Sequence, residues 1–206
     1  MYLKHNVWFF KNALDKAWCD KIIKKYKTKA TKKGKIGGDG AKISAKKNKE
    51  RRNSHIVWVN EEQIYKTLNP YLHTANKNAG WNFEVSWSEQ IQFTKYTKGQ
   101  YYNWHMDAFF APYKNHRYPQ YEGKIRKLSC SVLLNDPDEY TGGDLEIGQN
   151  NNVETPLEDN KINMSQCNLG QGSIIFFPGF VWHRVTPIEK GTRYSLVMWT
   201  VGKPYV

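Results

Sequence analysis

The strongest constraint on the fold is an alternation of apolar and polar side chains that begins at Glu84. The apolar members are Val85, Trp87, Ile91 and Phe93, and the polar residues between them extend to Tyr96. Further strand candidates lie at 127–135, 144–147, 173–177 and 193–201, separated by turns that contain Gly or Pro. Many short strands with such turns are typical of a β-sandwich or barrel. Residues 148–170 are polar and predict a surface excursion.

The N-terminal part of the chain has a different pattern. Its predicted elements are a strand at 7–10, a helix from Asp15 to about Tyr26, a strand at 54–59 and a helix at 61–72. In the first helix, apolar residues four positions apart define one buried face. We expect one domain over residues 1–206, a length that a single core accommodates. In this domain 1–83 supports a β core formed by 84–206, so the predicted fold class is mainly β (α+β).

Positive charge is concentrated in one segment. Residues 24–52 contain thirteen Lys or Arg and two acidic residues, whereas the rest of the chain is nearly neutral. The stretch 27–52 lacks apolar periodicity and predicts a long loop. Three interpretations stay open: a solvated loop, a lid over a substrate entrance, and an arm that binds nucleic acid. Its glycines favour the lid, and we expect Arg51, Arg52 and Ser54 beside it to line a substrate channel.

Cysteine content and hydropathy indicate the cellular compartment in which the protein is expected. The three cysteines, Cys19, Cys130 and Cys167, are far apart and form no disulfide framework or CxxC pair. The first ten residues lack the apolar run of a signal peptide, and no stretch approaches the ~20 apolar residues of a membrane span. We therefore expect a soluble, cytoplasmic protein without a membrane partner.

The most informative segment runs from Tyr101 to Asp107. On a strand, residues two positions apart share a face, so His105 and Asp107 point the same way. The same rule places Tyr102 and Trp104 on the opposite, apolar face. The HxD pattern alone is more often a surface or hydrogen-bonded pair than a metal site. A third ligand is therefore needed to make it a metal site.

His183 is the candidate third ligand. It lies 78 residues after His105, so contact requires a sheet that closes on itself, as in a jelly roll. Two imidazoles and one carboxylate form the facial triad of non-heme Fe(II) oxygenases, which leaves coordination positions open. The sequence therefore favours an iron site at His105, Asp107 and His183.

A charged residue lies ten positions after His183. Strand parity places Arg193, Ser195, Val197 and Trp199 on one face. An Arg at the inner end of such a strand is costly to bury unless an anion meets it. Its planar guanidinium suits a carboxylate, which it binds through two hydrogen bonds.

Together these motifs resemble the 2-oxoglutarate/Fe(II)-dependent dioxygenases, and within them the prolyl 4-hydroxylase branch. The matching segments are Tyr96, Gly99 and Tyr102 before HxD, Leu134-Asn135, Gly142-Gly143-Asp144-Leu145-Glu146-Ile147, and Arg193-Tyr194 with Trp199. The resemblance extends from about residue 90 to 201. It implies a double-stranded β-helix, or jelly roll, with N-terminal supporting helices.

The resemblance also implies residue roles. His105, Asp107 and His183 would bind Fe(II), and Arg193 would hold the distal carboxylate of 2-oxoglutarate. The remaining co-substrate contacts would come from the Tyr96 hydroxyl, Ser195 and Trp199. The chain departs from the hypoxia-sensing branch at Leu133, where that branch has a co-substrate-binding Tyr, so Ser129 or Ser131 would help instead. The cofactors implied are Fe(II), 2-oxoglutarate and O2, with ascorbate as a reductant.

The function implied is hydroxylation of a peptidyl residue, proline above all, with release of succinate and CO2. A protein or peptide is then the expected partner. One alternative is a nucleic-acid base oxygenase or demethylase, whose second Arg is replaced here by Trp199. Hydroxylation of a free amino acid or other small molecule is another, and a metal-binding jelly roll without catalysis is a third. The sequence leaves the oligomeric state open.

Overall fold

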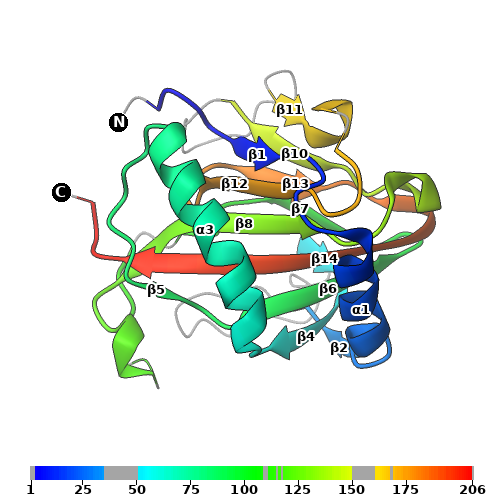
Figure 1. The fold of residues 1–206 in the computed structure, drawn as a ribbon, viewed down its shortest axis with the longest axis horizontal. Helices are drawn as coiled ribbons and strands as arrows, with labels where there is room; N and C mark the ends of the chain where they lie inside the picture. The colour runs from blue at the N-terminus through cyan, green and yellow to red at the C-terminus, as the bar shows by residue number, and fades with distance from the viewer. Residues whose placement is uncertain are drawn as a thin grey trace.

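The computed structural model describes residues 3–34, 51–108, 111–114, 116, 118–149, 161–167 and 169–205. Two antiparallel sheets dominate it (Figure 1). The larger sheet follows the order β1 (Trp8–Phe10), β12 (Ile174–Pro178), β8 (Ile125–Leu133), β14 (Ile188–Gly202), β6 (Ile91–Thr97), β4 (His55–Val59), β2 (Lys32–Lys33); β5 (Trp87–Ser88) and β9 (Tyr140–Gly142) pair with β14. The smaller sheet is β11 (Lys161–Asn163), β10 (Leu145–Gly148), β13 (His183–Val185), β7 (Tyr101–His105) and β3 (Arg52–Asn53). The mainly β prediction is confirmed.

Two N-terminal helices, α1 (Lys16–Tyr26) and α3 (Glu62–Asn78), support the larger sheet. In Figure 1 α3 crosses in front of β8 and β14, and α1 lies near the ends of β14 and β6. Buried side chains of both helices form one apolar cluster with the sheet. The predicted end of the second helix at Leu72 is wrong. The helix continues because Ala75 is fully buried and the Asn76 side chain is bonded to Phe83: its Nδ2 donates to the Phe83 carbonyl, and its Oδ1 accepts from the Phe83 N–H.

The central strands are buried on both faces. In β12, Ile174 and Phe176 pack on the helix side, whereas Ile175 and Phe177 belong to the cluster between the sheets. This accounts for the uninterrupted apolar run there, since each face of the strand meets a different core. In β6, by contrast, the side opposite the helices carries polar residues, and these line an interior cavity together with residues of the smaller sheet.

Two predicted loop regions contain strands. Within the expected excursion at 148–170, β11 pairs with β10, and Met164 and Leu169 are buried, so that expectation is wrong for 161–167 and for residue 169. Within the expected loop at 27–52, β2 pairs with β4 and β3 pairs with β7. The lid interpretation concerns mainly residues 35–50, which lie outside the described residues.

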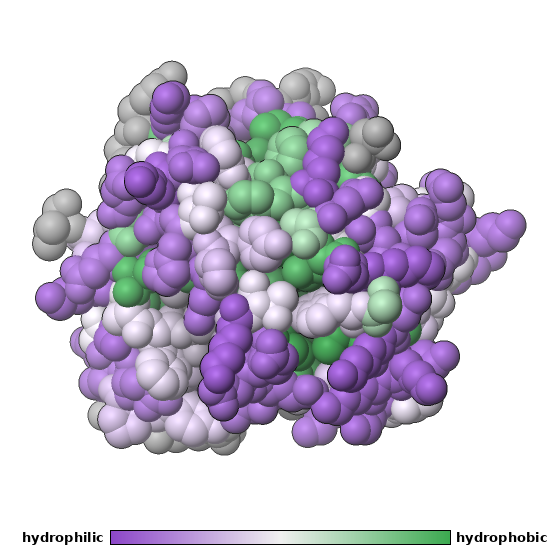
Figure 2. Space-filling view, in the orientation of Figure 1, coloured by the Kyte–Doolittle hydropathy of each residue, from purple (hydrophilic) through white to green (hydrophobic). Residues whose placement is uncertain are grey.

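The surface over the helices is mostly hydrophilic, with apolar residues visible between the elements (Figure 2). Among the described residues, the large apolar side chains that are exposed are Trp58, Trp87 and Tyr118. Neither helix of this part of the chain has the length and apolar character needed to cross a membrane.

Candidate metal and co-substrate site

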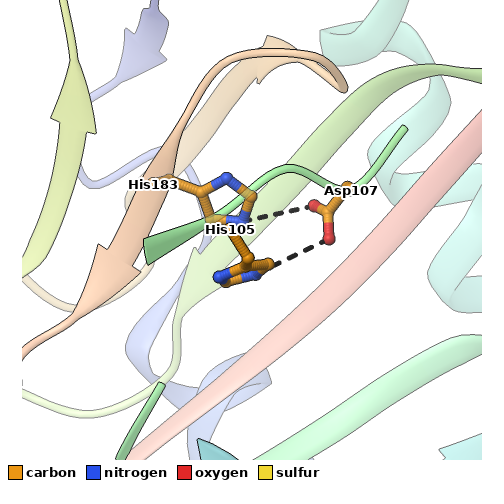
Figure 3. Close-up of side chains that lie close together, drawn as sticks. All are labelled: His105, Asp107 and His183. Carbon is orange, nitrogen blue, oxygen red and sulfur yellow. Dashed lines mark ion pairs between the residues drawn. The ribbon is translucent and has the colours of Figure 1, made fainter. Parts of the chain in front are cut away.

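The structure brings His105, Asp107 and His183 together, and we refer to them as the triad (Figure 3). His105 ends β7 and is the register partner of His183 on β13, while Asp107 follows in a bend. The backbone N–H of Asp107 bonds the Gly179 carbonyl, which fixes the bend beside β13. Asp107 Oδ1 lies 3.8 Å from His105 Nε2, and Asp107 Oδ2 lies 3.4 Å from His183 Nε2. One ligand atom of each residue lies within 4.8 Å of the other two, close enough to share one ion.

Each imidazole is oriented for metal binding by the backbone carbonyl of the residue two positions before it. His105 Nδ1 lies 2.7 Å from the Asn103 carbonyl oxygen, and His183 Nδ1 lies 3.0 Å from the Val181 carbonyl oxygen. A carbonyl accepts only, so each Nδ1 carries the proton and each Nε2 presents a lone pair towards the triad. Burial, followed by the neighbouring His183, lowers the pKa of His105 well below its usual value. His105 is therefore neutral near pH 7, as a metal ligand must be.

The Asp107 carboxyl is held ionised. Burial alone would raise its pKa, but the nearby His183 and His105 rings and Arg126 bring the pKa below its usual value. The Ser129 hydroxyl donates to Asp107 Oδ2 at 2.7 Å, which fixes the orientation of the carboxylate. Ser129 was expected near the co-substrate; the structure gives it this bond to the carboxylate instead.

The predicted position of Tyr102 is wrong. Its ring stacks on the His105 imidazole, with centroids 3.5 Å apart and planes 13° apart, and it lines the cavity. The reason is a bulge: Tyr102 and His105, three residues apart, pair with Val185 and His183, two residues apart. The extra residue reverses the parity of the strand. Trp104 does face away from the triad, beneath the Arg184 guanidinium at 4.8 Å.

A second group of predicted residues lines the same cavity from β14 and β6. As strand parity predicts, Arg193, Ser195, Val197 and Trp199 all face it, and Tyr96 joins them as the register partner of Arg193. Arg193 is only 2% exposed, and its Nη1 donates to Ser195 Oγ at 3.1 Å.

Two donors in this cavity lack partners in the described part of the chain. Arg193 Nη2 and Trp199 Nε1 are both buried, and neither forms a hydrogen bond there. Leaving such donors unpaired is costly, so the cavity is suited to a ligand that accepts hydrogen bonds. For the guanidinium of Arg193 the best acceptor is an anion. This fits 2-oxoglutarate, whose carboxylates are such acceptors.

A buried ion pair that lies behind the cavity was not predicted from the sequence. Arg126 forms a two-fold interaction with Glu89, with N–O distances of 2.8 and 2.7 Å, and Tyr113 donates to the same carboxylate. The Arg126 guanidinium also lies 4.2 Å from the Trp199 ring centroid. The pair therefore fixes the position of Trp199. Its members are 37 residues apart, and neither belongs to a motif.

The remaining predicted residues are placed as follows. Arg52 is buried and lines the cavity from β3, Ser54 is buried beside it, and Arg51 is exposed. Leu133 belongs to the apolar cluster between the sheets.

A second, larger cavity of about 630 Å³ lies between α3, β5 and the short helix η1 (Pro119–Tyr121), away from the triad.

Solved structures share the fold. The viral collagen prolyl hydroxylase of Paramecium bursaria Chlorella virus-1 superposes with a TM-score of 0.64 at 18% identity, covering 96% of this chain and 97% of that chain. A Pseudomonas putida prolyl-4-hydroxylase gives 0.62 at 17% identity, covering 98% and 94%. A Trichoplax adhaerens prolyl hydroxylase, solved with a hypoxia-inducible-factor peptide, gives 0.60 at 14%, covering 95% and 83%. The fold is a jelly roll, as predicted.

Sequence comparison identifies the family. PKHD-type hydroxylases of Pseudoalteromonas atlantica and Delftia acidovorans are 29% and 32% identical over 108 and 111 residues, or 52% and 53% of this chain and 41% and 42% of theirs. The chain thus spans less than half the length of these curated relatives. The model of the 2OG-Fe(II) oxygenase superfamily matches residues 91–201, which contain the triad and Arg193. The family's cofactors are Fe(II), 2-oxoglutarate and O2, and the triad fits the metal. The chain belongs to the 2OG-Fe(II) oxygenase superfamily.

Proposed function

We propose that this oxygenase hydroxylates a peptidyl residue, most specifically proline, and releases succinate and CO2. The observation that carries the proposal is the triad and Arg193 facing one interior cavity. The choice of proline is supported by the prolyl hydroxylases among the solved structures and by the PKHD-type relatives. A protein or peptide is the corresponding partner.

The proposed residue roles follow the sequence prediction. His105, Asp107 and His183 bind Fe(II), and Arg193 binds the distal carboxylate of 2-oxoglutarate through Nη2, the donor that has no partner among the described residues. The other co-substrate contacts come from Tyr96, Ser195 and Trp199, which line the same cavity. Leu133 contributes only apolar surface, so the hydroxyl groups of Tyr96 and Ser195 supply the polar contacts.

When bound, Fe(II) and 2-oxoglutarate supply the activation of O2 that inserts an oxygen atom into a C–H bond. The protein orients these groups and excludes water. The triad would hold the metal through two imidazoles and one carboxylate, a ligand set that would leave further coordination positions open. The Tyr102 ring packed on His105 and the Phe177 ring, 4.6 Å from His183, give the metal ligands dry surroundings. Dry walls strengthen the charge interactions on which the site depends.

The first test offers the iron-loaded enzyme and 2-oxoglutarate three substrate panels: proline-containing peptides, free amino acids, and methylated single-stranded oligonucleotides. We expect stoichiometric succinate and a product that carries one added oxygen atom on a prolyl peptide. Mass spectrometry of each substrate checks this. Succinate without hydroxylated product does not count, since co-substrate turnover can occur without substrate.

The other panels decide between the alternatives. Oxygenated or demethylated oligonucleotide with unmodified peptides would contradict the peptide assignment and favour a nucleic-acid oxygenase. Product from a free amino acid alone would make this a small-molecule hydroxylase. Ascorbate is included in one half of each panel, because the proposed role as reductant predicts more turnovers with it than without it.

A further inference from the structure

A second arginine in the site cavity has no role in the reaction outlined above. Arg52 is only 5% exposed and lines the cavity that contains the triad. Its guanidinium carbon lies 4.5 Å from the centroid of the Tyr102 ring, and that ring stacks on His105. A permanent positive charge is therefore held one aromatic ring away from a metal ligand.

The surroundings of Arg52 are built to hold it there. Its Nε donates to Ser54 Oγ at 2.8 Å, and its Nη2 donates to Gln92 Oε1. The backbone of Gly34 also lies so close to this contact that a Cβ there would come within 2.5 Å of both Arg52 Nε and Ser54 Oγ. Only a glycine permits this approach without displacing the guanidinium. Oriented in this way, Arg52 loses little side-chain freedom when it binds a ligand.

Its partners are nevertheless all neutral. The buried Arg126 pairs with Glu89, and the partly buried Arg184 pairs with Glu146. Within the described ranges, no carboxylate forms an ion pair with Arg52. A buried charge without a counter-charge is costly, so an anionic partner for Arg52 is expected from outside the chain.

A charge count points to the substrate as the source of that anion. The cavity is lined by two arginines, Arg52 and Arg193, and one carboxylate, Asp107. With neutral imidazoles these groups carry one net positive charge. Fe(II) adds two positive charges and 2-oxoglutarate adds two negative ones, so one positive charge remains. Because Arg193 has a buried donor free for the co-substrate, the charge that remains uncompensated is that of Arg52.

We propose that Arg52 is a substrate-binding residue that pairs with a carboxylate of the substrate, next to the carbon that is hydroxylated. This inference rests on the proposed function and defines its substrate class as an acidic one. The carboxylate has two sources with the same chemistry: an Asp or Glu side chain near the target residue of a peptide, and the α-carboxylate of a free amino acid or C-terminal residue.

The test uses four proteins: wild type, Arg52→Gln, Arg52→Lys, and Arg184→Gln as a matched control. Arg184 also lies over an aromatic ring of β7, Trp104, but on the face away from the cavity. Each protein is loaded with Zn(II) and 2-oxoglutarate, so that binding is measured without turnover. Calorimetry then compares a proline peptide containing Glu with its Gln counterpart, and L-proline with L-prolinamide.

For the wild type we expect the carboxylate ligand of one pair to bind about 10-fold or more tightly than its amide counterpart, the range for a hydrogen-bonded charge. The preference should disappear in Arg52→Gln, persist in part in Arg52→Lys, and be unchanged in Arg184→Gln. The pair that shows the preference identifies the source of the carboxylate. The proposal would be overturned if Arg52→Gln still bound the carboxylate ligand more tightly than its amide counterpart. It would also be overturned if Arg52→Gln lost as much affinity for 2-oxoglutarate as Arg193→Ala, since Arg52 would then bind the co-substrate.

A second readout separates this proposal from the prolyl assignment. Acetate is titrated into the same Zn(II)-loaded proteins with isotope-labelled arginine, and the Arg52 side-chain resonance is identified by its absence in Arg52→Gln. A saturable shift of that resonance, without binding of any proline compound, would support the carboxylate site and contradict the prolyl function. The opposite outcome is also distinguishable: acidic and neutral prolyl peptides are both hydroxylated and bind with equal affinity, and acetate does not shift the Arg52 resonance. That outcome would contradict the carboxylate site but leave the prolyl function standing.

Discussion

Replacing His105 or Asp107 by alanine should reduce bound Fe(II) from one equivalent to background, and His183→Ala should weaken binding severely. The triad supplies every His or carboxylate ligand clustered in this cavity among the described residues, so no neighbouring group replaces a lost one. Metal analysis after anaerobic loading and desalting measures the occupancy of each variant.

His73→Ala provides the control for these variants, since His73 is an exposed histidine on α3 and lies outside the site. Its metal content should equal that of the wild type. Thermal denaturation of the metal-free proteins checks that the triad variants remain folded. Full iron occupancy in all three triad variants would remove this site from consideration as the metal centre.

Arg193→Ala should lower the affinity for 2-oxoglutarate by about 30-fold or more while iron is retained. Removing one partner of a buried charge-assisted pair costs about 2–5 kcal/mol, and that range corresponds to this change in dissociation constant or a larger one. Anaerobic titration of the iron-loaded variant with 2-oxoglutarate measures the effect.

Arg193 has one of the largest fully buried side chains, so its truncation also leaves a cavity. Arg193→Lys keeps the charge and most of the volume, and it should recover part of the lost affinity but not the two-fold geometry of a guanidinium. Ser195→Ala should have a smaller effect, because Ser195 contacts the guanidinium by one hydrogen bond of 3.1 Å. An unchanged dissociation constant in Arg193→Ala would show that another group holds the co-substrate.

Strand parity succeeded where pairing is regular. β14 pairs without a register shift with β6 from Thr192 to Val197 and with β8 from Ser195 to Thr200. Arg193, Ser195 and Trp199 therefore share a face, as the alternation predicts. The same rule failed for Tyr102, because the bulge between β7 and β13 depends on how two distant strands meet. No local pattern encodes that meeting. Long-range contacts thus decided which aromatic ring lies on the metal ligand.

The alternation in β6 also acquires its meaning only in three dimensions. Its apolar residue Phe93 packs under the helices, whereas the polar Gln92 and Tyr96 face the interior cavity. On an ordinary sheet surface such polar residues face water. The sequence predicted the strand and its two faces but had no means to show that the polar face encloses a site. The Arg126–Glu89 pair could not be predicted for a similar reason, since the two residues are far apart in the sequence and meet only in the folded chain.

The most direct test of the account is a crystal structure of the protein grown anaerobically with Fe(II) and 2-oxoglutarate, with anomalous scattering recorded at the iron edge. We expect one iron peak bound by His105 Nε2, His183 Nε2 and an Asp107 oxygen. We also expect 2-oxoglutarate with one end on that iron and its distal carboxylate on Arg193. Iron elsewhere, or a co-substrate whose distal carboxylate contacts Arg52 instead of Arg193, would contradict the proposed site.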